Sequence, residues 1–113
     1  MAAAVPDVLR SLANGSITGS YVAVGGPLTH NWRMFRLIND TDGDMFVSVD
    51  GTNNNYFVPA NSFVLYDLAC NGASVMQTDV FVLAIGTQFY VKYSTAPTVK
   101  SFYIEGVYAR GSY

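Results

Sequence analysis

Apolar and polar residues alternate over short stretches of this chain, and turn residues separate the stretches. The period of two is clearest at residues 45–50, where Met45, Val47 and Val49 share one face, and at residues 87–93. Such alternation is typical of strands that bury one face. The turn signals recur about every 8–12 residues, which predicts an all-β sandwich or barrel with about seven or eight strands.

The pattern also predicts where the strands and turns lie. Residues 80–85 are almost continuously apolar, which is typical of a strand covered on both faces. Residues 40–44 contain an Asp-Gly pair, which favours the positive φ of a tight hairpin, and residues 50–55 form a second turn or loop. The predicted strands cover residues 16–24, 32–38, 45–49, 56–58, 62–68, 80–85, 87–93 and 101–108.

The length of 113 residues fits one domain. We expect residues 1–15 to form an N-terminal arm, either as a short helix ended by Asn14-Gly15 or as an extended segment. Residues 16–113 are expected to form a single antiparallel β-sandwich with jelly-roll-like topology. Apolar side chains in the arm favour its ordering against a neighbouring subunit.

Charge is scarce in this chain. Only 12% of its residues are charged, against about 25% in an ordinary soluble domain, whereas half are hydrophobic and sixteen are Phe, Tyr or Trp. The six Lys and Arg residues are scattered and the net charge is −2, so we expect no nucleic-acid partner. Cys70 is the only cysteine, which rules out an intrachain disulfide and favours a reducing compartment.

An apolar, aromatic surface with few charges is expected to be covered by other subunits. The sequence therefore predicts a homo-oligomer or a component of a larger assembly, with no membrane partner, because no apolar run approaches the ~20 residues of a membrane span. A sugar-stacking platform is the alternative use of the aromatic residues. The candidate interface residues are Val5, Leu9, Leu12, Tyr21, Trp32, Tyr56, Tyr90, Tyr103 and Tyr113.

Three acidic residues, Asp40, Asp42 and Asp44, suggest a calcium loop. An EF-hand loop needs glycine at position six and glutamate at position twelve, whereas here Gly43 is at position four and Gly51 at position twelve. We therefore expect a turn at these residues and no metal site, with a different oxygen-ligand loop that includes Asp50 as the alternative.

Candidate catalytic groups are equally weak. His30, Asp67 and Cys70 supply the residue types of a thiol nucleophile site, but no motif surrounds the cysteine, and a lone cysteine is usually a packing residue. Glu105 is the only glutamate, and we expect it to face solvent or to pair with an arginine. The sequence thus predicts no catalytic residue, no cofactor and no enzymatic activity.

Several short motifs resemble a known family. They are LINDTD at residues 37–42, VSVDG at 47–51, FVPANSF at 57–63, GTQFYVK at 86–92 and YIEGVY at 103–108. Over about residues 33 to 109 the chain resembles small virion structural proteins of tailed bacteriophages.

The resemblance implies a non-enzymatic virion component, assembled in the host bacterial cytoplasm, and it supplies no ligand residues. Its partners would be the major capsid protein or other virion proteins. The role we expect is a capsid cement or decoration protein that stabilises the head. A ring at the head–tail junction or in the tail, and a carbohydrate-binding module of a host-recognition apparatus, are the alternatives.

Overall fold

The computed structural model describes residues 4–68 and 82–109, which form nine strands and one short 3-10 turn, Asn14–Ser16. The strands are β1 (Ala4–Pro6), β2 (Arg10–Ala13), β3 (Val22–Ala23), β4 (Trp32–Asn39), β5 (Met45–Ser48), β6 (Tyr56–Val58), β7 (Ser62–Asp67), β8 (Tyr90–Tyr93) and β9 (Ser101–Ala109).

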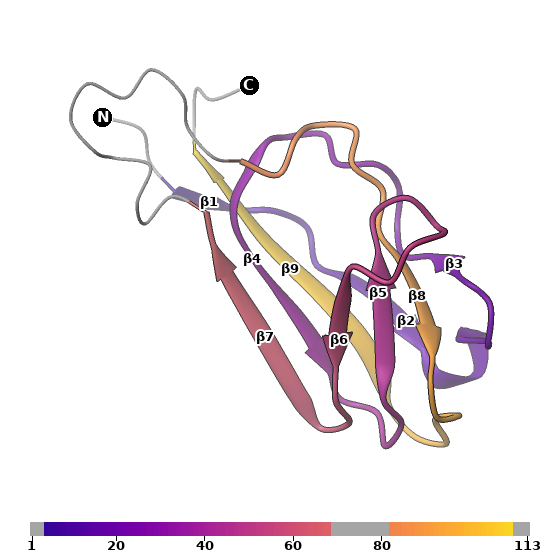
Figure 1. Cartoon of the computed structure of the whole chain (residues 1–113). Coiled ribbons are helices and arrows are strands. Elements are labelled where there is room, and N and C mark those ends of the chain that lie inside the picture. Colours follow the sequence, from indigo (N-terminus) through magenta and orange to yellow (C-terminus); the bar gives the residue numbers. More distant parts are fainter. Residues whose placement is uncertain (1–3, 69–81, 110–113) are drawn as a thin grey trace.

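The strands form two antiparallel sheets packed as a sandwich (Figure 1). Sheet A has the order β1-β9-β4-β7, with β2 pairing along β9 on the same side as β1, and sheet B has the order β3-β8-β5-β6. The pairs β5–β6, β4–β7, β3–β8 and β2–β9 are nested around one central hairpin. Folding this long ribbon over itself adds the pairs β4–β9 and β5–β8 and produces a jelly roll, which confirms the predicted fold class.

Residues 4–13, which we name the N-terminal segment, belong to the sandwich. The sequence predicts an N-terminal arm, either a short helix or an extended segment, ordered against a neighbouring subunit. The segment is extended, but β1 and β2 pair with successive stretches of β9 in the same chain. The physical reason is that β9 would otherwise expose a row of unpaired backbone groups along its whole edge. No boundary at residue 15 separates an arm from the sandwich.

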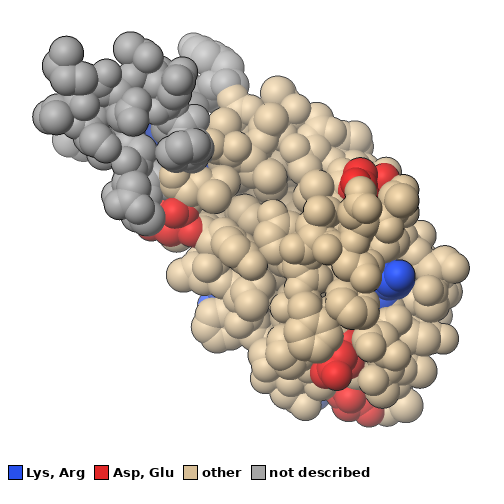
Figure 2. Space-filling view, viewed as in Figure 1, with Lys and Arg blue, Asp and Glu red and all other residues tan. Residues whose placement is uncertain are grey.

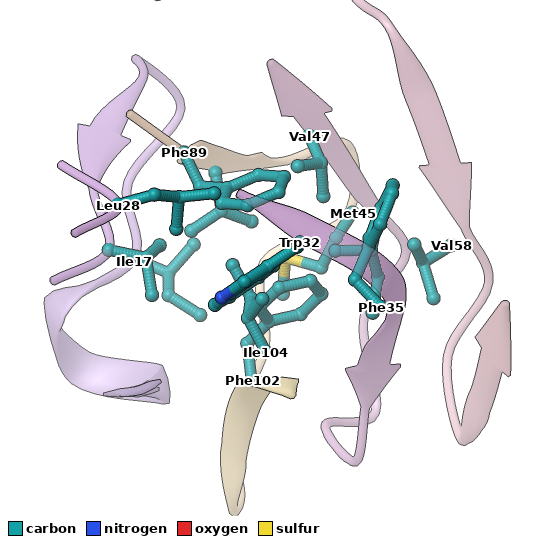
Figure 3. Packing of buried hydrophobic residues seen from close by; sticks show 13 residues of the cluster. Ile17, Leu28, Trp32, Phe35, Met45, Val47, Val58, Phe89, Phe102 and Ile104 are labelled. Carbon is teal, nitrogen blue, oxygen red and sulfur yellow. The ribbon is translucent and has the colours of Figure 1, made fainter. Parts of the chain in front are cut away.

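The core lies between the sheets and centres on Trp32, whose exposed fraction is 0% (Figure 3). Its ring packs 5.9 Å from that of Phe89, and Gly106 on the neighbouring strand leaves room for it. The buried cluster consists of Ile17, Val24, Leu28, Trp32, Phe35, Leu37, Met45, Val47, Val58, Phe89, Val91, Phe102 and Ile104.

Most predicted strands occur, and the alternation within them is confirmed: Met45 and Val47 are fully buried, whereas Phe46 points outward. The predicted strand over residues 16–24 shrinks to β3. The predicted strand over residues 80–85 is wrong for the described part, residues 82–85. There Leu83 makes only an isolated bridge to Trp32, and Ile85 is 55% exposed.

The predicted hairpin at residues 40–44 is a crossover between the two sheets, because β4 lies in sheet A and β5 in sheet B. Gly43 is needed there for space and not for a positive φ. A Cβ atom at Gly43 would lie 2.1 Å from the carbonyl oxygen of Thr95. The hairpin of this region is instead the loop between β5 and β6, where Gly51 has a φ of +78°.

Candidate interaction surface

The outward face of sheet A carries a patch of apolar side chains. Strand β7 contributes Phe63 and Leu65, which are 55% and 56% exposed. The register places Ile38 of β4 between Phe63 and Tyr103, and it places Arg36 between Leu65 and Glu105. We name this surface the outer A face. Its residues are Met34, Arg36, Ile38, Phe63, Leu65, Asp67, Tyr103, Glu105 and Val107.

An ion pair lies at the centre of the outer A face. The Nη2 and Nε atoms of Arg36 lie 2.6 and 2.8 Å from Oε1 of Glu105, and the guanidinium also lies 5.1 Å from the ring of Phe63. The expected pairing of Glu105 with an arginine is thereby confirmed. Both side chains are more than a third exposed, so the pair contributes little to the stability of the fold. It leaves the centre of the face polar but without net charge.

Three hollows lie along the outer A face, and one of about 320 Å³ is lined by Arg33, Met34, Asp67 and Val107 among others. The other two both border Glu105. One of about 250 Å³ lies beside the ion pair and is lined mainly by Met34, Leu65 and Val107. The other, of about 260 Å³, lies where the N-terminal segment meets β9 and is lined by Pro6, Asp7, Leu9, Glu105, Gly106 and Val107. The N-terminal segment therefore extends the face, and Leu9 adds a further side chain that is 52% exposed.

The outward face of sheet B is aromatic. The rings of Phe46 and Phe57 lie 5.3 Å apart, and Nζ of Lys92 lies 4.8 Å from the ring of Tyr21 and 5.9 Å from that of Phe46. The hydroxyl of Tyr21 donates a hydrogen bond to Oδ1 of Asn54. The polar groups of this face thus already engage one another within the chain. Figure 2 shows how few charged groups interrupt the uncharged surface in the view it gives.

The predicted interface residues are dispersed in the structure. Tyr103 and Leu9 lie on or beside the outer A face, whereas Leu12 and Tyr56 pack against the core. Trp32 is wrong as an interface residue, because complete burial leaves it no surface to present.

The remaining candidates lie elsewhere. Val5 pairs with Tyr108, Tyr21 contacts Lys92 on sheet B, and Tyr90 pairs with Ser48 beside the β5–β6 loop. Tyr113 lies outside the described residues.

Sequence reasoning missed the residues that make up most of the outer A face, above all Leu65, Arg36 and Met34. The stretch 62–67 contains apolar residues at consecutive positions, so its period does not reveal which side faces outward. The pairing of β7 with β4 does, because Arg36 and Leu65 are cross-strand partners. The one available signal was the absence of charged residues from positions 62–66.

A polar contact fastens the N-terminal segment to the core. The indole N–H of Trp32 donates to Oδ2 of Asp7 at 2.7 Å, and the backbone N–H of Val8 donates to Oδ1 at 2.7 Å. His30, which stacks on Tyr108 with ring centroids 3.7 Å apart, places Nδ1 3.8 Å from the same carboxylate. Burial opposes ionisation of Asp7, but these hydrogen bonds and the nearby positive groups outweigh it and hold its pKa below the usual value.

Replacing Asp7 with alanine should loosen the N-terminal segment and lower the stability of the fold by about 1–3 kcal/mol, because the buried indole N–H of Trp32 loses its acceptor. Trp32 is the only tryptophan, so its fluorescence and the amide exchange of residues 4–13 measure the effect directly. Asp40→Ala is the matched control. Equal stabilities of the two variants would contradict this role of Asp7.

The same contact has a defined pH dependence. Because the folded-state pKa of Asp7 is lowered, its stabilising effect is present above the ordinary carboxyl pKa of about 4 and is lost as the pH falls below it. The difference in stability between the wild type and Asp7→Ala should therefore shrink on acidification. Urea titrations at neutral and acidic pH measure it.

The acidic residues of the crossover hold loops together. Asp42 accepts hydrogen bonds from the backbone N–H and the hydroxyl of Thr98, and Asp44 accepts one from the backbone N–H of Ala60 at 2.9 Å. Within residues 4–68 and 82–109, no group of three or more His, Cys, Asp or Glu side chains could hold a metal ion.

The proposed thiol site lies partly beyond the structural description. His30 stacks on Tyr108 near Asp7, whereas Cys70 falls outside the described residues, so its contacts with His30 and Asp67 stay untested. None of the helices in the described ranges is long and apolar enough to cross a membrane.

Comparisons with known proteins add no relative to this picture. No family model, no curated protein and no solved structure matches the chain. The features that bear on function are therefore the chemistry of the two outer faces and the short motifs that resemble phage virion proteins.

Proposed function

We propose that this chain is a non-enzymatic structural protein of a tailed-phage virion, and specifically a cement or decoration protein that binds between capsid subunits. The observation that supports it is the outer A face, where Phe63 and Leu65 are more than half exposed around a pair without net charge. Exposure of such an apolar face to water is unfavourable in a monomer, whereas assembly buries the face against another subunit. Jelly rolls occur in capsid proteins and also in lectins, so the fold alone does not decide between them.

The proposed mechanism is thermodynamic. A protein that binds the assembled shell but not the free capsid subunits stabilises the shell by mass action. Scarce charge suits this role, because an apolar contact needs few desolvated ions. Many copies on one particle then add their effects over the whole shell. A head–tail or tail ring would use the same surface with cyclic symmetry.

A carbohydrate-binding role has one specific observation in its favour, the aromatic outer face of sheet B. The side chain of Lys92 lies over the rings of Tyr21 and Phe46, and Asn54 is occupied by the hydroxyl of Tyr21. A sugar would have to displace these contacts. Binding on a glycan array that Tyr21→Ala removes would support this role, and a silent array would contradict it.

Particles purified from cells that carry the encoding gene test the proposal. We expect these particles to contain the chain in a copy number comparable to that of the capsid subunits. We also expect particles depleted of it to release their genomes at a lower temperature. Adding the purified chain back should restore the release temperature. Absence of the chain from purified particles would refute the virion role, and equal release temperatures would refute the cement role.

A further inference from the structure

We propose that the partner on the outer A face is a second copy of this chain, packed sheet against sheet about a two-fold axis that runs parallel to β4 and β9 and between them. This inference deepens the proposed function and depends on its claim that the outer A face is covered on assembly. It makes the dimer, and not the single chain, the unit that binds the shell, through surfaces other than the outer A face. Its basis is that two copies of this face, packed against each other, place opposite charges and apolar side chains in contact.

The position of the axis determines which strands meet. Rotation about a two-fold axis that lies in the interface and runs parallel to the strands leaves the position of each residue along the strand direction unchanged. It reverses the order of the strands across the sheet. Strand β4 of one copy then faces β9 of the other, and β7 faces the N-terminal segment. This is the ordinary arrangement of two sheets packed face to face, with crossing angles near −30° from the sheet twist.

The charges select this arrangement. Arg36 and Glu105 are cross-strand neighbours on β4 and β9, so the axis places Arg36 of each copy opposite Glu105 of the other. The two intrachain pairs become a ring of four alternating charges. A two-fold axis perpendicular to the strands would instead place Arg36 opposite Arg36, which opposes association.

The apolar positions match in the same arrangement. Met34 pairs with Val107, and Ile38 pairs with Tyr103, across β4 and β9. In the dimer, Met34 of one copy therefore faces Val107 of the other, and Ile38 faces Tyr103. Leu65 lies level with Glu105 on the far side of Arg36, and it therefore faces the N-terminal segment of the second copy.

The N-terminal segment has a hollow at that height. The backbone N–H of Asp7 donates to the carbonyl oxygen of Gly106, and Arg10 is the cross-strand partner of Ile104. Val8 and Leu9 therefore lie opposite Glu105. The hollow of about 260 Å³ beside Leu9 is the place where Leu65 of the second copy would insert. These rows therefore meet complementary rows, and Asp67, which is level with Met34 and Val107, lies at the end of the face opposite the level of Pro6 in the second copy.

The size of the face suits a dimer of moderate affinity. Four strand positions about 4.8 Å apart and about six residues long at about 3.3 Å per residue give a projected area of about 400 Å². The projected area is about half of the ~800 Å² of accessible surface that each partner buries in an interface of standard size, so the face lies at the small end of stable interfaces. We therefore expect reversible, concentration-dependent dimers.

Sedimentation equilibrium of the full chain tests the inference through charge reversal. Arg36→Glu and Glu105→Arg each place like charges opposite one another, so each variant alone should sediment near the monomer mass of 12.3 kDa. Mixing the two variants should restore a 1:1 heterodimer, because both positions are acidic in the first variant and basic in the second. Only a contact between copies explains such rescue, since the intrachain pair of each variant remains broken. Lys100→Glu is the charge-reversal control.

A second pair of variants does not involve the ion pair. Leu65→Glu should weaken self-association at least tenfold, whereas Phe57→Glu, which alters a similarly exposed strand residue on sheet B, should leave it unchanged. Circular dichroism establishes that each variant is folded. A wild type that stays monomeric, single variants that dimerise, a mixture that stays monomeric, or dissociation by Phe57→Glu alone would each overturn the inference.

The particle assay separates this inference from the proposed function. If the wild type is monomeric but still binds depleted particles, the partner on the outer A face is another virion protein and not a second copy, and the proposed function stands. A dimer that is absent from purified particles would refute the proposed function and leave the second copy as the partner of the face.

Discussion

Gly106→Ala is expected to destabilise the fold by about 3 kcal/mol or more, and to prevent folding if the core cannot relax. Gly106 lies on β9 directly under the indole of Trp32. A Cβ atom there would lie 2.2 Å from two ring carbons of Trp32 and 2.5 Å from a third. Because the indole is fully buried and hydrogen-bonded to Asp7, it cannot swing into solvent to make room.

Thermal and urea unfolding measure this prediction. Gly26→Ala is the matched control, since nothing lies within 4 Å of a Cβ atom at Gly26 and its φ is not positive. The control should have the stability of the wild type or slightly more, because alanine restricts the unfolded chain. A Gly106→Ala variant as stable as the control would show that the packing under Trp32 is looser than described.

Asn39→Leu should destabilise the fold by about 3 kcal/mol or more, although leucine has nearly the shape of asparagine. Asn39 is fully buried at the end of β4. Its Nδ2 donates to the carbonyl oxygens of Gly43 at 2.8 Å and Val58 at 3.0 Å, and its Oδ1 accepts from the backbone N–H of Thr41 at 3.0 Å. Leucine offers none of these bonds, and the buried backbone groups it abandons cannot reach water.

The consequence should concentrate on the crossover between the sheets, since Asn39 joins the end of β4 to β6 in the other sheet. Hydrogen exchange should show early opening of residues 39–45 and 58–60. Asn53→Leu, the same substitution in an exposed loop, is the control and should cost far less. Equal losses in both variants would assign the effect to leucine itself and not to the buried network.

The residues most responsible for the fold class were visible in the sequence. Alternation at residues 45–48 separates Met45 and Val47 from Phe46, and the structure confirms which of them are buried. Frequent turn residues separate strands too short for anything but a sandwich or barrel. The expected pairing of Glu105 with an arginine is also confirmed, because the register of β9 and β4 places Arg36 directly beside it.

Local rules failed where partners distant in sequence compete with them. The Asp-Gly pair at residues 42–43 is compatible with a hairpin, but the buried bonds of Asn39 and the close approach of Thr95 make the segment a crossover. Residues 4–13 have no strong strand signal of their own, and they become strands because the edge of β9 offers them hydrogen bonds.

Composition and alternation alone predict a β-sandwich with few charges and many aromatic residues. They do not predict which of the apolar residues lie together outside the core, which follows from the pairing of strands in three dimensions. A period of two assigns residues to the faces of one strand, but it carries no information on which strand lies alongside or at what height. The register of β7, β4 and β9 brings Phe63, Ile38 and Tyr103 into one row, although they are far apart in the chain. The outer A face exists because of that register.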